Sequence, residues 1–162
     1  MACFMIVGRE EPLYELLLEP TLSRREDVAR STQFILHGSL DLVDLQIWTN
    51  PATHLKLVDR HNDQFVSAYV TPSGTRFLLL HDGRSDDSIK AFFVDVHELF
   101  VKVCFSKLGM SCSHSPQTRA QLPLTQVLLN PLYSPDSRIE SKEFDSKARA
   151  LAKRTLGYRI DA

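Results

Sequence analysis

The short connections between apolar stretches are the feature that most constrains this fold. Residues 2–8 and 13–18 are joined by the turn GREEP, and residues 65–71 and 75–82 are joined by the three residues PSG. The alternating stretch at 54–60 leads into 65–71 through an equally short HND turn. Parallel strands need a crossover of about a dozen residues, whereas antiparallel strands pair across hairpins of this length. We therefore expect a five-stranded antiparallel sheet and exclude a doubly wound parallel one.

Three further segments have helical periodicity. Residues 23–48 begin with Ser23 and Glu26 at capping-box spacing, in which both side chains satisfy free backbone donors. Residues 88–105 carry apolar side chains at helical spacing, and 141–156 form an amphipathic stretch that runs from acidic to basic. The element order is then ββαβββαα, which defines an α+β fold.

The chain length favours one domain over residues 1–162. Within it, residues 106–125 are rich in serine and lack a strong period, so we interpret them as a flexible surface insertion. Residues 157–162 are expected to form a short C-terminal tail.

The first helix has apolar residues on two sides, as the stretch FILHGSLDLVDLQIW at 34–48 shows. At 100° per residue, one stripe is expected to pack on the sheet: Leu36, Leu40, Val43 and Ile47. A second apolar zone contains Phe34, Ile35, Leu42, Leu45 and Trp48. Gly38 is expected to allow close approach of a neighbour, and a polar seam between the zones contains His37, Asp41 and Asp44.

The seam has three interpretations. His37, Asp41 and Asp44 could be an acid–base set, but catalysis needs a concave pocket, which the side of a helix on a sheet seldom supplies. The second zone could fold under the chain's own loops. Alternatively, it is a protein interface, because charge around apolar anchors is how interfaces select a partner. The pattern favours the interface and predicts Phe34, His37, Asp41, Asp44, Leu45 and Trp48 as partner-binding residues.

Composition and motifs favour few other functions. The formal net charge is −1, unlike the basic field of a nucleic-acid binder. No apolar run approaches the roughly 20 residues of a membrane span, so any membrane contact is expected to be peripheral. No nucleotide-binding or metalloprotease motif is present, and we predict no cofactor, no metal and no catalytic residue. His81 is expected to be structural rather than a base.

Most of the chain resembles the sedlin family, the small longin-fold subunits of the TRAPP vesicle-tethering complex. The matching stretches are FMIVG and PLYE at 4–15, QFILHGSLDLVD at 33–44, LKLVDRHNDQFVSAYVTPSGTRFLLLHD at 55–82, IKAFFVDVHELFVK at 89–102, and NPLYSPDSRIESKEFDSKARALAKRTL at 130–156. The resemblance implies a longin (SNARE-like, profilin-like) fold, with one helix on one face of the sheet and two on the other. The insertion at 106–125 and the tail at 157–162 depart from the family pattern.

The resemblance also implies a function. It implies a non-enzymatic adaptor that links the TRAPP core to larger subunits in ER-to-Golgi and Golgi transport, at the cytoplasmic side of those membranes. Other TRAPP subunits are the implied partners, with SNARE proteins as further contacts and a Rab-family GTPase contacted indirectly. The family's acidic helix surface falls on Asp41 and is implicated there in adaptor contacts. The alternative is a stand-alone regulatory longin domain that binds a SNARE or a small GTPase.

Overall fold

The computed structural model describes residues 2–9, 11–18, 25–107, 138–139 and 141–158. The predicted order ββαβββαα is confirmed. The elements are β1 (Ala2–Val7), β2 (Pro12–Leu18), α1 (Arg25–Thr49), β3 (His54–His61), β4 (Gln64–Val70), β5 (Arg76–His81), α2 (Asp86–Lys107) and α4 (Lys142–Leu156). Each strand boundary in the structure lies within one residue of the predicted boundary. The expected cap at Ser23 and most of the expected insertion lie outside the described residues.

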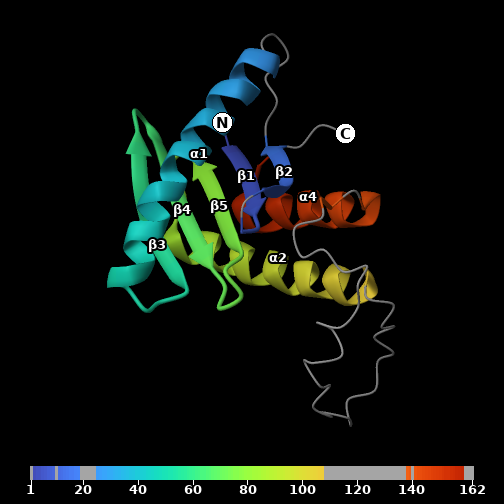
Figure 1. Ribbon diagram of the computed structural model, residues 1–162. Coiled ribbons are helices and arrows are strands. Elements are labelled where there is room, and N and C mark those ends of the chain that lie inside the picture. The colour runs from blue at the N-terminus through green and yellow to red at the C-terminus, as the bar shows by residue number, and fades with distance from the viewer. Residues whose placement is uncertain (1, 10, 19–24, 108–137, 140, 159–162) are drawn as a thin grey trace.

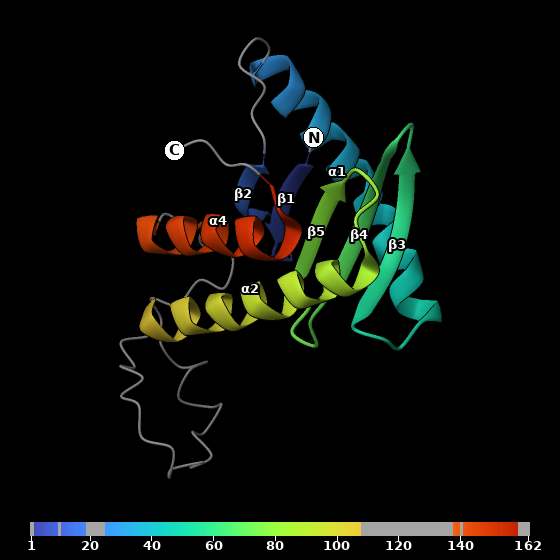
Figure 2. The ribbon, with the colours of Figure 1, turned by 180° about the vertical axis from the view of Figure 1, so that it is seen from behind.

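The five strands form one antiparallel sheet in the order β2-β1-β5-β4-β3. Helix α1 lies on one face, and α2 and α4 lie side by side on the other (Figures 1 and 2). The expected longin arrangement is therefore confirmed. Two of the hairpins turn through left-handed residues, Asn62 at φ 54° and Gly74 at φ 86°.

Strand β1 is apolar throughout because both of its faces are buried. Alternate side chains point to opposite sides of a sheet, so Phe4 and Ile6 join the core under α2 and α4, while Cys3 and Met5 join the core under α1. The core under α2 and α4 is aromatic. Phe4, for example, lies edge-to-face on Phe92 with ring centroids 5.2 Å apart.

The last helix is capped at both ends and tied to the sheet. The Ser141 side chain accepts a hydrogen bond from the Phe144 backbone N–H at its start, and Gly157 is left-handed at its end. Tyr158, the second residue of the expected C-terminal tail, is only 1% exposed, and the Arg84 guanidinium lies 4.6 Å from its ring centroid. The Tyr158 ring therefore belongs to the core cluster under α2 and α4.

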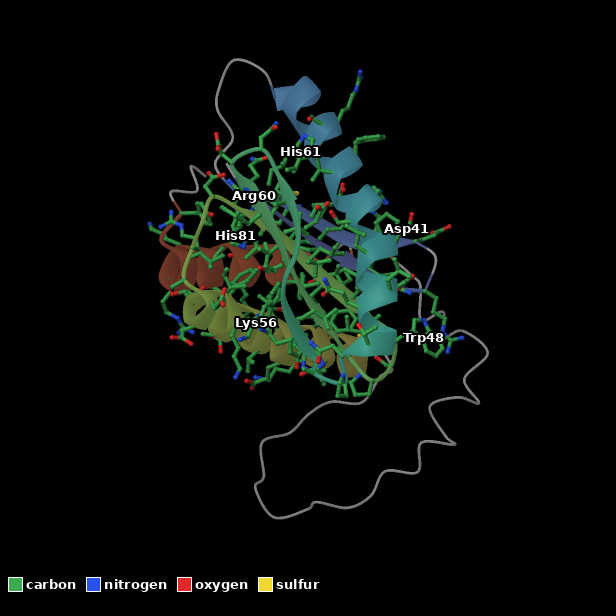
Figure 3. All side chains as sticks on the ribbon, turned by 90° about the vertical axis from the view of Figure 1, so that its left-hand side faces the viewer. Asp41, Trp48, Lys56, Arg60, His61 and His81 are labelled. Carbon is green, nitrogen blue, oxygen red and sulfur yellow. The ribbon has the colours of Figure 1, made fainter. Side chains whose placement is uncertain are left out.

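Strand β3 forms one outer edge of the sheet, where Figure 3 labels Lys56, Arg60 and His61. The register of β3 on β4 shifts twice, between His54 and Lys56 and between Leu57 and Asp59. Lys56 itself is left-handed, at φ 51°. Charged side chains and bulges are the usual means by which an edge strand avoids pairing with other chains.

Candidate partner-binding surface

The sheet-facing side of α1 agrees in its centre with the prediction. Leu36 and Val43 are fully buried, and Leu40 packs partly against the same core cluster. Two assignments were wrong. Ile47 is 37% exposed, because the last turn of α1 lies at the edge of the sheet beside β3 (Figure 1). Ile35 packs against the core cluster instead of belonging to the outer zone.

The opposite side of α1 exposes large apolar side chains. The exposed fraction is 80% for Phe34, 65% for Leu45 and 89% for Trp48. Among the described residues, none buries these three side chains, which favours the interface over burial under the chain's own loops. Exposed aromatic side chains clustered on one element are typical of a contact surface.

His37 and Asp41 lie between these apolar residues and are both exposed. In Figure 3, Asp41 and Trp48 follow one another along α1, well apart from the labelled residues of β3. A Cβ atom added to Gly38 would meet nothing within 4 Å, so the expected close approach at Gly38 does not occur within the described chain. We call the exposed set Phe34, His37, Gly38, Asp41, Leu45 and Trp48 the α1 outer stripe.

Asp44 has a partner inside the chain. Its Oδ1 lies 2.7 Å from Arg76 Nη2, and Arg76 Nη1 donates a hydrogen bond to the Gly8 carbonyl. Arg76 begins β5, so this ion pair fixes α1 to one end of the sheet. The Asp44 side chain remains 47% exposed, so it borders the outer stripe while it serves the fold.

A shallow pocket of about 230 Å³ lies beside His37, between α1 and β2. Within it, Gln33 Nε2 donates a hydrogen bond to Glu15 Oε2 at 2.6 Å. Neither Asp41 nor Asp44 lines this pocket, so the structure does not assemble the three seam residues into one concave site. Sequence reasoning missed Glu15, although a single acid within the apolar run LYELLL at 13–18 was the available signal.

His81 is a structural residue, as predicted. It is buried, and its Nδ1 accepts a hydrogen bond from the Arg84 backbone N–H. The other ring nitrogen, Nε2, therefore carries the proton and donates to Ser67 Oγ at 3.0 Å. Burial lowers the pKa of the imidazole, which keeps it neutral and satisfied inside the fold.

Among the residues whose placement is described, no three His, Cys, Asp or Glu side chains come together as metal ligands would. Within the same ranges, no helix combines the length and apolar character needed to cross a membrane.

The fold and the surface together define a class: a longin-type α+β module that exposes an apolar and charged helix face. Comparison with known proteins gives the family. The family model described as Sedlin matches residues 6–116, which is more than half of the chain. This protein belongs to the sedlin family.

Three relatives are named as complex subunits. A Schizosaccharomyces pombe protein named transport protein particle 20 kDa subunit is 37% identical over 154 residues, covering 93% of this chain and 96% of its own. A Drosophila melanogaster protein named probable trafficking protein particle complex subunit 2 is 41% identical over 102 residues, covering 61% of this chain and 73% of its own. A Caenorhabditis elegans protein of the same name is 31% identical over 157 residues and covers 94% of both chains.

Proposed function

We propose that this protein is a non-catalytic subunit of the TRAPP tethering complex. The observation that carries the proposal is the near full-length match to the S. pombe transport protein particle subunit, in which both chains are covered almost end to end. The proposed role is that of an adaptor in ER-to-Golgi and Golgi vesicle transport, which links the complex core to its larger subunits.

The α1 outer stripe is the proposed contact surface of the adaptor. Phe34, Leu45 and Trp48 supply apolar area that water now covers, and burial of such area favours association. Asp41 and His37 supply the polar contacts that select one partner from others. Asp44 lies at the border of the stripe and can contact a partner, because about half of its side chain stays exposed beside Arg76.

The remaining partners follow from the same role. We propose peripheral action at ER–Golgi and Golgi membranes from the cytoplasmic side, with membrane contact made through the assembly. SNARE proteins are proposed as further contacts, and a Rab-family GTPase as one reached through other subunits.

The test is an affinity pull-down from native cytosol with the tagged wild type and with Asp41→Lys, read by mass spectrometry. We expect the wild type to recover TRAPP subunits and Asp41→Lys to lose at least one of them, because charge reversal opposes a matched partner. Glu98→Lys is the matched control, since Glu98 is an exposed helical carboxylate on α2, across the sheet from α1.

Two results would count against the proposal. If the wild type recovers no TRAPP subunit, the complex assignment fails, and a stand-alone regulatory longin domain that binds a SNARE or a GTPase takes its place. If Asp41→Lys and Glu98→Lys recover the same subunits as the wild type, the complex assignment stands and the α1 outer stripe is not its contact surface.

A further inference from the structure

The α1 outer stripe has the spacing of a coiled-coil seam. Five of its members follow one another at intervals of four, three, four and three residues: Phe34, Gly38, Asp41, Leu45 and Trp48. Helices that repeat contact positions in this way present them along one line to a neighbouring helix. This regularity distinguishes the stripe from apolar residues scattered singly over a surface, which need no explanation.

Each seam position is available to a neighbour. Phe34, Leu45 and Trp48 are at least 65% exposed, and Asp41 is also exposed. Gly38 lies between Phe34 and Asp41 without a side chain, and the space in front of it is open within 4 Å. A glycine at a seam position leaves a recess into which a large side chain of a facing helix fits.

Asp41 is the charged member of an otherwise apolar seam. The neighbouring acid, Asp44, is already matched by Arg76 at 2.7 Å, whereas Asp41 has no ion pair within the described part of the chain. Packing an apolar helix over Asp41 would remove water from a carboxylate, which costs free energy unless a cation replaces the water. A single polar residue in a seam is also the usual device for fixing register and partner.

A second copy of this chain is a poor occupant. Phe34 and Trp48 each lie seven residues from Asp41, so two copies that aligned these three positions would place Asp41 against Asp41 whether the helices ran parallel or antiparallel. Two like charges facing each other in an apolar contact are strongly unfavourable. The stripe therefore opposes self-pairing and favours a different chain with the complementary charge.

We propose that the α1 outer stripe binds one amphipathic helix of another protein. That helix has apolar residues at heptad spacing, one Arg or Lys opposite Asp41, and a large side chain over Gly38. The inference deepens the proposed function and rests on it, because it names the chemistry of the partner that the adaptor surface takes. Trp48 lies at one end of the seam and Phe34 at the other, and together they mark the length of helix that is covered.

The test uses a synthetic three-heptad peptide with leucine at its seam positions and one central arginine. A second peptide differs only in a glutamate at that central position. Trp48 is the single tryptophan of the chain, so its emission reports burial at the seam directly. We expect the arginine peptide to shift the emission of Trp48 to shorter wavelength in a saturable titration, and the glutamate peptide to bind about tenfold more weakly or worse.

Reversing the charge at position 41 gives the decisive version of this experiment. Asp41→Arg is expected to reverse the preference, binding the glutamate peptide and rejecting the arginine peptide. Glu98→Arg, on the other face of the sheet, is expected to keep the wild-type preference. The proposal is overturned if the arginine peptide leaves the Trp48 emission unchanged, or if the wild type binds both peptides equally.

These outcomes separate the inference from the proposed function. If the pull-down with Asp41→Lys loses a TRAPP subunit but the peptides do not bind, the surface is correct and its helical occupant is wrong. If the peptides bind with the expected preference while the wild type recovers no TRAPP subunit, the helix-binding seam stands and the complex assignment falls.

Discussion

The two faces of the sheet are covered in different ways. Helices α2 and α4 together cover one face over an aromatic core, whereas α1 alone covers the other and keeps large apolar residues on its outer side (Figures 1 and 2). A single helix on a sheet contacts it with one side only. Its outer side can therefore carry residues that do not serve the packing of the fold. We therefore expect the α2–α4 face to contribute most of the stability, and the α1 face is the proposed recognition surface.

The largest expected effect comes from truncating matched phenylalanines on the two faces. Phe92→Ala should lower the free energy of unfolding by about 3–5 kcal/mol, because Phe92 is fully buried against Phe4. Phe34→Ala should change it by no more than about 0.5 kcal/mol, since Phe34 is 80% exposed. Urea unfolding measures both variants. Equal losses would show that the outer side of α1 is also part of the core.

Acidification should weaken the α2–α4 side. Burial lowers the pKa of His54, His81 and His97 below the ordinary 6.5, and His54 and His97 both lie against aromatic rings of that core. Between the lowered folded values and 6.5, the unfolded chain binds more protons than the folded one, so stability falls as the pH drops below 6.5.

Urea midpoints measured from pH 7.5 down to pH 5 test this expectation. His81→Gln should show a shallower dependence on pH than the wild type, because one of the three titrating groups is gone. A midpoint that stays constant across this range would contradict the lowered pKa of these histidines in the folded chain.

Filling the recess on α1 should stabilise the fold slightly. Gly38→Ala is expected to raise the free energy of unfolding by about 1 kcal/mol, because alanine is the better helix former and the added Cβ meets nothing within 4 Å. Thermal unfolding measures the gain. A loss of stability instead would mean that α1 is packed closely at Gly38.

The smallest effect on stability is expected at Asp41. Asp41→Lys should change the free energy of unfolding by no more than about 0.5 kcal/mol, since the residue is exposed, while it weakens partner binding. Calorimetry beside the pull-down separates the two effects. Unfolding of this variant at ordinary temperature would make Asp41 a structural residue.

The fold was largely predictable because short hairpins and helical periodicity are local signals. Two-sided apolarity also predicted that α1 has an outer surface, but a helical projection does not show where the sheet ends, and for this reason Ile47 was misplaced. The Asp44–Arg76 ion pair joins residues from separate elements, and no local pattern in either segment indicates it. The burial of Tyr158 has no local signal either, because its contact with Arg84 depends on how α4 packs.

The bulged, charged edge at β3 has a consequence for how this chain enters an assembly. Hydrogen bonds between the main chains of two subunits depend little on sequence. A regular, open edge strand could therefore pair with many different extended segments. The left-handed backbone at Lys56 and the two register shifts make pairing of another strand along this edge unfavourable. Association along the β3 edge must then depend on side chains, which makes non-specific strand pairing there unfavourable before the subunit meets its partners.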